Sequence, residues 1–320
     1  EVGRKKSETL TGEAAVYVIF TSGSTARPKA VAIAQRGLLN RFAWMTSFFG
    51  DEMPNTLQTT PLAFDSAVWQ VLWPLTRGGT CVLPERHELF DVEALATLVA
   101  REQVTVADFV PSVLQSLLPE FESANSAVGR LQGLRWVILG AERLRAETAR
   151  RLSALLPAAR IVNLYGPTEA TIGCIYHEIS GDTGAIVPIG RPLPNVQAYV
   201  TGKDGWLLPR GAVGELVVSG DCFVIGYLGQ TTANGFCTVP FAEGTDARAY
   251  RTGDLVRWNE QGELEYYGRI DSQLKIRGIR IEPSGVEKVI YSYPGVQEVE
   301  LLVVPGEESN PQDELVAFVK

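Results

Sequence analysis

The first half of the chain alternates between short apolar runs and segments in which apolar residues recur at helical spacing. Residues 14–20 form a run rich in β-formers, which predicts a buried strand. Over residues 35–49 the apolar positions recur every three or four residues, which predicts a helix. We expect further strands at 57–60, 80–83, 104–110, 135–139 and 160–164, and helices at 66–75, 91–101, 112–118 and 146–156. This alternation indicates βαβ units, in which helices cover a mostly parallel sheet.

The pattern changes near residue 181, where Gly and Pro become frequent and the expected strands become short. Those strands lie at 197–200, 215–219, 255–258 and 263–267, and the turn Asn259–Gly262 joins the last two as a hairpin. Beyond them, Pro283 suits the first turn of a helix that ends near residue 291, and strands are expected at 296–304 and 314–319. We therefore expect three units: an α/β core over 1–180, an antiparallel β-barrel-like unit over 181–270, and a partial C-terminal subdomain over 271–320.

Composition and charge narrow the classes of partner. The 320 residues carry a net charge of −8, which argues against nucleic acid or an anionic membrane as the main partner. The four cysteines form no C-x-x-C pair and there are only two histidines, so we expect neither a zinc site nor a disulfide framework. We expect reduced thiols and a cytoplasmic location instead. No apolar stretch approaches the roughly 18 residues of a membrane span. Both ends resemble cuts from a longer polypeptide, since the chain opens without Met and stops directly after an apolar run.

The stretch Thr21–Ala30 concentrates hydroxyl side chains, a glycine and two cations directly after the first expected strand. Hydroxyls and backbone N–H groups donate to phosphate oxygens, and a lysine supplies a point charge. The stretch does not fit the Walker pattern, because no second Gly precedes Lys29. Taken alone it fits a polyphosphate loop or a polar surface loop equally well.

Three more polar clusters lie where expected strands end, which is where ligands bind in open α/β sheets. They are Asn163–Glu169, Tyr250–Leu255 and Gly268–Gly278. Each cluster alone is also consistent with a packed turn, an Asx cap or a surface ion pair.

Together and in this order, the clusters resemble the motifs of adenylation domains of nonribosomal peptide synthetases, whose superfamily includes acyl-CoA ligases and firefly luciferase. Thr21–Ala30 is similar to the phosphate loop T-S-G-[ST]-T-G-x-P-K-G, and Phe64–Trp69 to F-D-x-S-x-W. Asn163–Glu169 matches N-x-Y-G-P-T-E, Tyr250–Leu255 matches Y-[RK]-T-G-D-L, and Gly268–Glu282 matches G-R-x-D-x-Q-x-K-I-R-G-x-R-I-E. A degraded G-E-L…G-Y-L motif lies between them. The resemblance covers essentially the whole chain.

The resemblance implies a two-step reaction. An amino acid carboxylate attacks the α-phosphate of Mg-ATP to form aminoacyl-AMP, and the aminoacyl group then passes to the phosphopantetheine thiol of a peptidyl carrier protein. It implies an adenylate-forming fold and the following roles. The residues that hold the β- and γ-phosphates are Thr21, Ser22, Gly23, Ser24, Thr25 and Lys29, and those that hold the nucleotide are Asn163, Tyr165, Gly166, Asp254 and Arg269. Thr168 contacts the α-phosphate and Glu169 binds Mg²⁺. Asp271 is the hinge of the C-terminal subdomain, and Lys275 faces the site in the second step.

The resemblance also implies a pocket for an α-amino acid. Asp65 takes the position that pairs with the substrate α-ammonium, and the remaining lining residues are Ser66, Trp69, Asp108, Ile138, Gly140, Leu164, Ile172 and Gly173. A carboxylate in such a pocket needs a cation or hydroxyl partner. Asp108 therefore leads us to expect a polar or basic substrate side chain. Gly140 and Gly173 suggest that the pocket also has room for a larger side chain.

The chain departs from the family pattern at three alanines that replace glycine, namely Ala26, Ala30 and Ala141. An alanine at φ > 0 costs roughly 1 kcal/mol. Glu282–Glu287 also differs from the usual E-L-G-E-I-E. The family's first subdomain and its N-G-K lysine are not found in these residues, so the chain taken literally is expected to adenylate poorly.

Two alternatives remain besides the amino-acid-activating enzyme. One is an acyl-CoA ligase, which Asp65 disfavours because its carboxylate would be left unpaired. The other is a degenerate domain that only binds nucleotide or scaffolds a synthetase. Other synthetase domains are expected partners, and the sequence leaves open a small activating protein.

Overall fold

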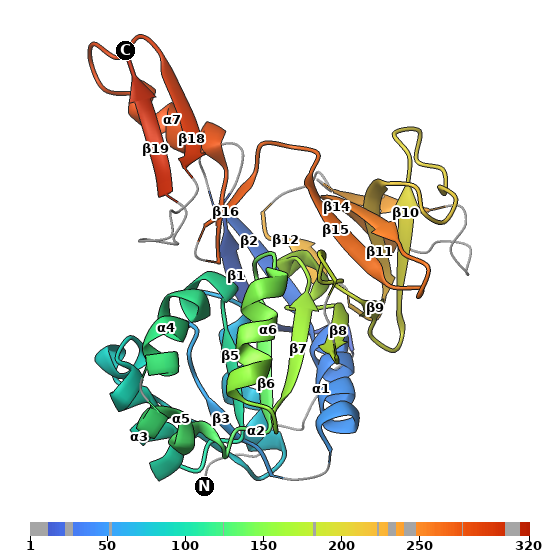
Figure 1. Ribbon diagram of the computed structural model, residues 1–320. Coiled ribbons are helices and arrows are strands. Elements are labelled where there is room, and N and C mark those ends of the chain that lie inside the picture. The colour runs from blue at the N-terminus through green and yellow to red at the C-terminus, as the bar shows by residue number, and fades with distance from the viewer. Residues whose placement is uncertain are drawn as a thin grey trace, which may run out of the picture.

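A computed structural model describes residues 12–22, 28–50, 53–123, 125–181, 184–222, 224–229, 235–239, 248–276, 278–304 and 314–320 of the chain. A large sheet with helices lies at the bottom of Figure 1, antiparallel strands lie beside it, and the C-terminal strands project away from both. The expected order of an α/β part followed by an antiparallel β part is confirmed.

The large sheet has seven strands in the order β4-β3-β5-β6-β7-β8-β9. Pairing is parallel from β4 to β7 and antiparallel from β7 to β9. The strands are β3 (Asn55–Leu57), β4 (Thr80–Val82), β5 (Val106–Phe109), β6 (Trp136–Gly140), β7 (Arg160–Tyr165), β8 (Ile175–Ile179) and β9 (Arg191–Pro192). The strand expected at 57–60 lies two residues earlier, and β8 and β9 were not anticipated.

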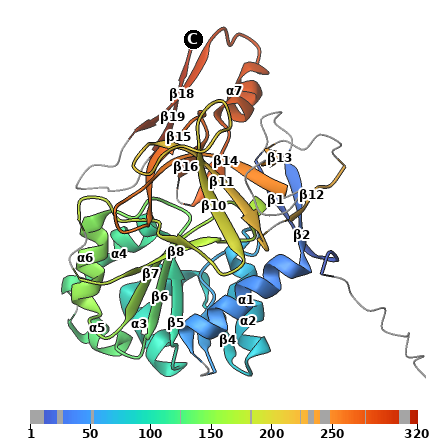
Figure 2. The same cartoon turned by 90° about the vertical axis from the view of Figure 1, so that its right-hand side faces the viewer.

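Helices cover both faces of this sheet (Figure 2). Along β6, Trp136 and Ile138 pack on one face with α1 and α2, while Val137 and Leu139 pack on the other with α3 to α6, as the two-residue period of a strand requires. The helices are α1 (Gln35–Phe49), α2 (Ser66–Thr76), α3 (Val92–Arg101), α4 (Pro111–Ser123), α5 (Asn125–Leu131) and α6 (Ala146–Leu155), with short 3₁₀ turns η1 (Arg86–Leu89) and η2 (Thr168–Ala170). The helix expected at 112–118 is longer than predicted, because Pro119 is tolerated within it.

A five-stranded antiparallel sheet follows, with β14 at its centre. Its strands are β10 (Val196–Thr201), β11 (Gly214–Gly220), β13 (Phe236–Thr238), β14 (Arg248–Trp258) and β15 (Leu264–Arg269). The predicted hairpin at Asn259–Gly262 is confirmed: β14 pairs with β15, and the Glu263 N–H donates to Asn259 Oδ1 at 2.9 Å. This register places Asp254 directly opposite Arg269.

The first expected strand is present as β1 (Ala15–Thr21), but the prediction that it is buried is wrong. Among the described strands it pairs with β2 (Lys29–Ala34) alone, at the edge of a small antiparallel sheet in which β2 also pairs with β12 (Val224–Tyr227). Ile19 is buried, whereas Phe20 is 68% exposed. An apolar run alone does not distinguish a strand covered on both faces from an edge strand.

The C-terminal part begins with a hairpin that sequence patterning missed, β16 (Leu274–Ile276) and β17 (Ile279–Ile281). Pro283 then opens α7 (Pro283–Tyr291), as predicted, and β18 (Val299–Val304) pairs with β19 (Glu314–Val319). Among the described helices, none is both long and apolar enough to cross a membrane.

Candidate functional site

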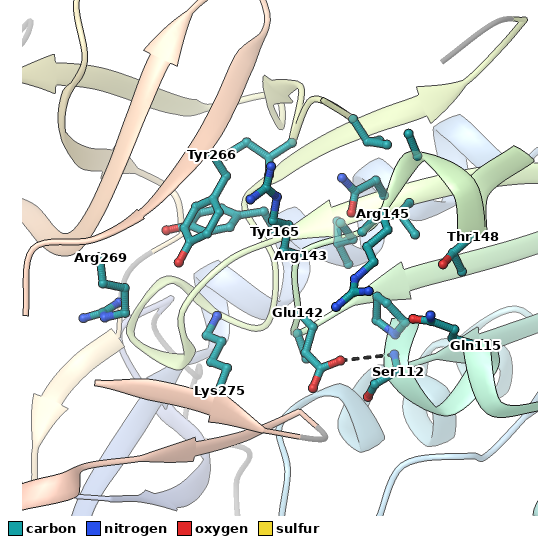
Figure 3. A pocket seen from close by; sticks show the side chains of 18 of the residues that line it. Ser112, Gln115, Glu142, Arg143, Arg145, Thr148, Tyr165, Tyr266, Arg269 and Lys275 are labelled. Carbon is teal, nitrogen blue, oxygen red and sulfur yellow. Dashed lines mark hydrogen bonds between the residues drawn. The ribbon is translucent and has the colours of Figure 1, made fainter. Parts of the chain in front are cut away.

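A cavity of about 680 Å³ lies between the carboxyl ends of β6 and β7, strand β15 and the β16–β17 hairpin (Figure 3). It brings together several predicted site residues from distant parts of the chain. Those that line it are Asn163, Leu164, Tyr165, Gly166, Arg269, Asp271 and Lys275. The cavity therefore lies where the topology of an open parallel sheet positions a ligand.

A chain of hydrogen bonds fixes the polar groups at one end of this cavity. The Tyr165 hydroxyl donates to Asp254 Oδ2, and Arg269 Nη1 donates to Asp254 Oδ1 at 2.6 Å. Arg269 also donates from Nε and Nη2 to both oxygens of Asp271, at 2.6 and 2.9 Å. Asp254 is 2% exposed and does not itself line the cavity, but it is held on both oxygens directly behind the lining residues Tyr165 and Arg269.

Tyr266 is a lining residue that sequence reasoning missed. Its ring centroid lies 6.5 Å from that of Tyr165, and the two rings are labelled side by side in Figure 3. Such a pair offers aromatic faces for a flat heterocycle. The sequence could have indicated Tyr266, because it lies on β15 only three residues before the predicted site residue Arg269.

Glu142 is a second residue that the motifs did not assign. It follows β6 and accepts from the Ser112 N–H at 3.1 Å and from the Gly278 N–H at 2.8 Å. Because Gly278 lies between β16 and β17, this carboxylate ties the hairpin to the large sheet. The preceding Ala141 has φ +71°, so an alanine occupies a left-handed conformation there.

The other two alanine substitutions differ from Ala141. Ala30 lies within β2 opposite Phe20 and has no positive φ. The backbone strain of an alanine in the left-handed region is therefore absent at this position. Ala26 lies outside the described residues, as do Gly23, Ser24 and Thr25.

Of the predicted phosphate loop, Thr21, Ser22 and Lys29 are described. Ser22 Oγ donates to the Arg280 carbonyl at 2.9 Å, and Lys29 Nζ lies 5.4 Å from the Tyr227 ring centroid. Thr21 Oγ1 is buried and has no hydrogen-bond partner among the described residues. Ser22 and Lys29, at the two described ends of this stretch, therefore contact Arg280 and Tyr227, to which the motif comparison assigned no role.

Glu169, in η2, is fully buried and forms an ion pair with Arg280. Arg280 Nη1 donates to both of its oxygens, at 3.1 and 3.0 Å, and the Tyr227 hydroxyl donates to Oε1 at 2.7 Å. Burial alone would raise the pKa of Glu169, but Arg280 and Tyr227 outweigh it and lower the pKa below its usual value. Glu169 is therefore ionised in the folded protein.

A magnesium ion bound with a nucleotide usually takes one or two carboxylates and completes its shell with phosphate and water oxygens. The described residues contain no group of three or more acidic, His or Cys side chains that could hold a metal alone. Glu169 fits the role of a single carboxylate ligand because it is ionised, and in this structure Arg280 supplies the positive charge beside it.

Lys275 lies on β16 with its Nζ 5.9 Å from the Tyr165 ring centroid (Figure 3). Burial lowers the pKa of its ammonium, and Asp254 partly counters the effect. Lys275 lines the cavity, while its predicted role in the second step stays a prediction.

Asp65 precedes α2, and its carboxylate does not cap that helix. Burial raises the pKa of Asp65 to about 6, against a lowering hydrogen bond from Thr168. Thr168, predicted to reach the α-phosphate, therefore also contacts the carboxylate predicted to bind the amino group.

Asp108, on β5, is held by a network that sequence reasoning missed. The fully buried Gln70 donates to Asp108 Oδ2 at 2.9 Å and accepts the Thr59 and Thr60 N–H groups at 3.0 and 3.1 Å. Burial raises the pKa of Asp108 to about 6, while Gln70 and the Arg41 charge lower it. Arg41 is 1% exposed, and burial lowers the pKa of its guanidinium to about 10.

The remaining pocket residues lie around β6 and β7. Ile138, Leu164, Ile172 and Trp69 are buried, and Ser66 begins α2. The glycines do not open space: a Cβ at Gly173 would lie 2.8 Å from Leu164 Cγ, and one at Gly140 would lie 3.2 Å from the Leu164 carbonyl oxygen. Both glycines instead allow close packing against Leu164. The expectation that they enlarge the pocket is therefore wrong.

Comparison with known sequences gives one consistent family. The sequence model of the AMP-binding enzymes matches residues 2–228. The chain is similar to zwittermicin A synthase ZmaJ of Bacillus cereus, with 38% identity over 315 residues, which is 95% of this chain and 58% of that protein. It is also similar to tyrocidine synthase 3 of Brevibacillus parabrevis, with 37% identity over 94% of this chain and 5% of that protein. The chain thus spans only part of the length of these relatives.

Solved structures agree with the sequence relatives. The nonribosomal peptide synthetase protein PA1221, which contains adenylation and PCP domains, superposes with a TM-score of 0.87 and 28% identity over 99% of this chain and 54% of that chain. The Vibrio cholerae adenylation domain AlmE, solved with glycyl-adenosine-5'-phosphate, gives a TM-score of 0.82 and 28% identity over 97% of this chain and 58% of that one.

Proposed function

Since the chain belongs to the AMP-binding enzyme family, with the adenylate-forming fold of nonribosomal peptide synthetase adenylation domains, we propose that it activates an α-amino acid. ATP and the amino acid carboxylate react to give aminoacyl-AMP and pyrophosphate. The aminoacyl group then passes to the phosphopantetheine thiol of a peptidyl carrier protein. The PCP domain of PA1221 supports such a partner, and other synthetase domains and a small activating protein are further candidates. Four free cysteines fit a reducing, cytoplasmic setting.

Asp65 is the observation that carries the proposal for an amino acid substrate. Its partly buried carboxylate contacts Thr168, next to the Glu169 site. The α-ammonium of an amino acid would compensate this charge, whereas a fatty or aryl acid would leave it unpaired at a cost of several kcal/mol.

The nucleotide would use the wall of the cavity. Tyr165 and Tyr266 would contact adenine, and Asp254, positioned by Arg269, would accept the ribose hydroxyls. Glu169 would hold Mg²⁺, which neutralises phosphate charge while the carboxylate attacks. Asp271 is proposed as the hinge. The phosphate role of the remaining residues is proposed from the motif alone: Thr21, Ser22, Gly23, Ser24, Thr25 and Lys29.

The charges around the amino acid pocket refine the substrate side chain. Asp108 already has Gln70 as a donor and Arg41 as a nearby cation, so its charge is compensated within the protein. Asp108 led us to expect a substrate with a polar or basic side chain. Because its charge is already compensated, we favour a substrate with a polar, uncharged side chain.

Trapping of the adenylate with hydroxylamine tests the proposal. The full-length protein, incubated with ATP and the twenty common amino acids, is expected to yield the hydroxamate of one or a few of them by mass spectrometry. Nucleotide binding without any hydroxamate would indicate the degenerate scaffold. In a parallel reaction with fatty and aryl acids, hydroxamates formed from these acids alone would indicate an acyl-CoA ligase.

A further inference from the structure

Arg41 is a buried cation of α1 that belongs to none of the predicted site residues. Its guanidinium lies 4.7 Å from the Trp44 ring centroid. Its Nη1 donates to the Gly173 carbonyl at 3.4 Å, which is a long hydrogen bond. Because Gly173 is a predicted residue of the amino acid pocket, α1 brings a positive charge to that pocket from outside the predicted set.

Two hydrogen-bond donors of Arg41 are left over. Among the described residues, its Nε and Nη2 atoms are buried and have no acceptor, and the nearby hydroxyl of Tyr17 on β1 also has no partner. Buried polar groups usually have a partner, and a buried donor without one costs free energy. Since a guanidinium can only donate, the missing partner of Arg41 is an acceptor.

A purely structural arginine on the same side of the large sheet has a different environment. Arg160 stacks over the Trp136 ring, with 4.1 Å between the guanidinium carbon and the ring centroid, much as Arg41 does over Trp44. However, Arg160 donates to both oxygens of Glu178. Stacking on an aromatic ring therefore does not account for the unsatisfied donors of Arg41.

The charges nearest to Arg41 belong to the pocket. Burial lowers the pKa of the Arg41 guanidinium to about 10, and the carboxylates of Asp108 and Asp65 partly counter this effect, so Arg41 is protonated at neutral pH. Asp108 takes its described hydrogen bond from Gln70 rather than from Arg41. Arg41 and Asp108 thus form a pair of opposite charges that are close but not in contact. Such a pair disfavours a second cation as well as a second anion.

We propose that Arg41 is a specificity-determining residue of the amino acid pocket: with Asp108 it selects an uncharged substrate side chain whose oxygen accepts from the free donors of Arg41. The inference rests on the proposed function and narrows its substrate class to amino acids with a side-chain carboxamide or hydroxyl group. Arg41 repels basic side chains and cancels the charge of Asp108 that would attract them. Asp108 repels acidic side chains in the same way.

ATP–pyrophosphate exchange by the full-length protein tests the selection, with kcat/KM measured for amino acids of matched size. The panel consists of glutamine, glutamate, lysine and methionine, the shorter asparagine, aspartate, ornithine and leucine, and threonine with valine. In the unchanged protein an amide or hydroxyl amino acid should exceed its charged and apolar matches. Arg41→Met should raise kcat/KM for lysine and ornithine about 10- to 100-fold relative to the uncharged amino acids, because Asp108 then lacks its cation.

Two further arginine variants serve as controls. Arg41→Lys keeps the positive charge and should retain the discrimination against basic amino acids. Arg36→Met removes an exposed arginine at the start of the same helix, which pairs with Glu13, and should leave the whole panel unchanged.

Asp108→Asn is an independent arm that leaves Arg41 in place. It should raise the relative kcat/KM for aspartate or glutamate by a similar factor, because the charge of Arg41 is then uncompensated. The double variant Arg41→Met/Asp108→Asn lacks both charges and should favour neither acidic nor basic amino acids.

The outcomes separate the inference from the proposed function. A preference for basic or apolar amino acids in the unchanged protein would overturn the inference alone. So would variants in which exchange falls by the same factor for every amino acid, since that result indicates a structural role of Arg41. If no amino acid supports exchange in the unchanged protein, the proposed function fails and the inference fails with it.

Discussion

Two partly or fully buried carboxylates, Asp65 and Asp108, belong to the pocket proposed for the amino acid. Both have a pKa raised to about 6 by burial. They differ in their partners, because Asp108 is bound by Gln70 and lies near Arg41, while Asp65 has the Thr168 hydroxyl. The sequence motif located both residues. It could not reveal Gln70 and Arg41, which lie on α2 and α1 and belong to no motif.

The first prediction concerns amino acid binding. Asp65→Asn is expected to raise the KM for the amino acid about 100-fold, because a charged hydrogen bond in a buried setting is lost, and to leave the KM for ATP nearly unchanged. In the unchanged protein the KM should rise as pH falls below about 6, where Asp65 becomes protonated. The variant should show no such rise. A parallel pH dependence in both proteins would contradict the role of Asp65.

The second prediction concerns stability. The folded pKa of Asp65, about 6, lies above its ordinary value of 3.8, so its favourable contribution is complete below the unfolded pKa and is lost as pH rises through 6. Denaturant titration should therefore show that Asp65→Asn gains stability relative to the unchanged protein, on the order of 1–3 kcal/mol, between pH 4.5 and 7.5. A constant difference across that range would show that Asp65 does not titrate as described.

Amphipathic periodicity located the long helices and the five parallel strands of the large sheet, but not its antiparallel strands β8 and β9. It also missed β2 and β12, which pair with each other across almost 200 residues of sequence, and the short local hairpin β16–β17. The β16–β17 hairpin matters most, because it places Lys275 at the cavity and brings Gly278 to Glu142 and Arg280 to Glu169. The family motif covered this segment but carried no information on its partners Glu142 and Glu169.

The turn after β6 gives a prediction at this scale. Ala141 has φ +71°, so Ala141→Gly should stabilise the protein by about 1 kcal/mol in thermal or denaturant unfolding. Ala30→Gly is the matched control, because Ala30 lies in β2 without positive φ and glycine there should destabilise the strand. The strain at Ala141 would be refuted if both substitutions lowered stability.

At the scale of the whole molecule, the site exists because separate sheets meet. Ser22 comes from the β1-β2-β12 sheet, Glu169 follows the large sheet, Asp254 lies on β14, and Arg280 lies on the C-terminal hairpin. The order of motifs along the chain predicted the kinds of residues but not that Arg280 would bridge two of them. Contacts between residues more than 100 positions apart leave no periodic signal in the sequence.

We propose that the site activates an α-amino acid and recognises its ammonium group through Asp65. ATP–pyrophosphate exchange in the full-length protein measures this activation, using the preferred amino acid, its des-amino analogue and the Asp65→Asn variant. Exchange should be supported by the amino acid, absent with the analogue and strongly reduced in the variant. Exchange that proceeds equally with the des-amino acid, or that is unaffected by Asp65→Asn, would contradict the claim.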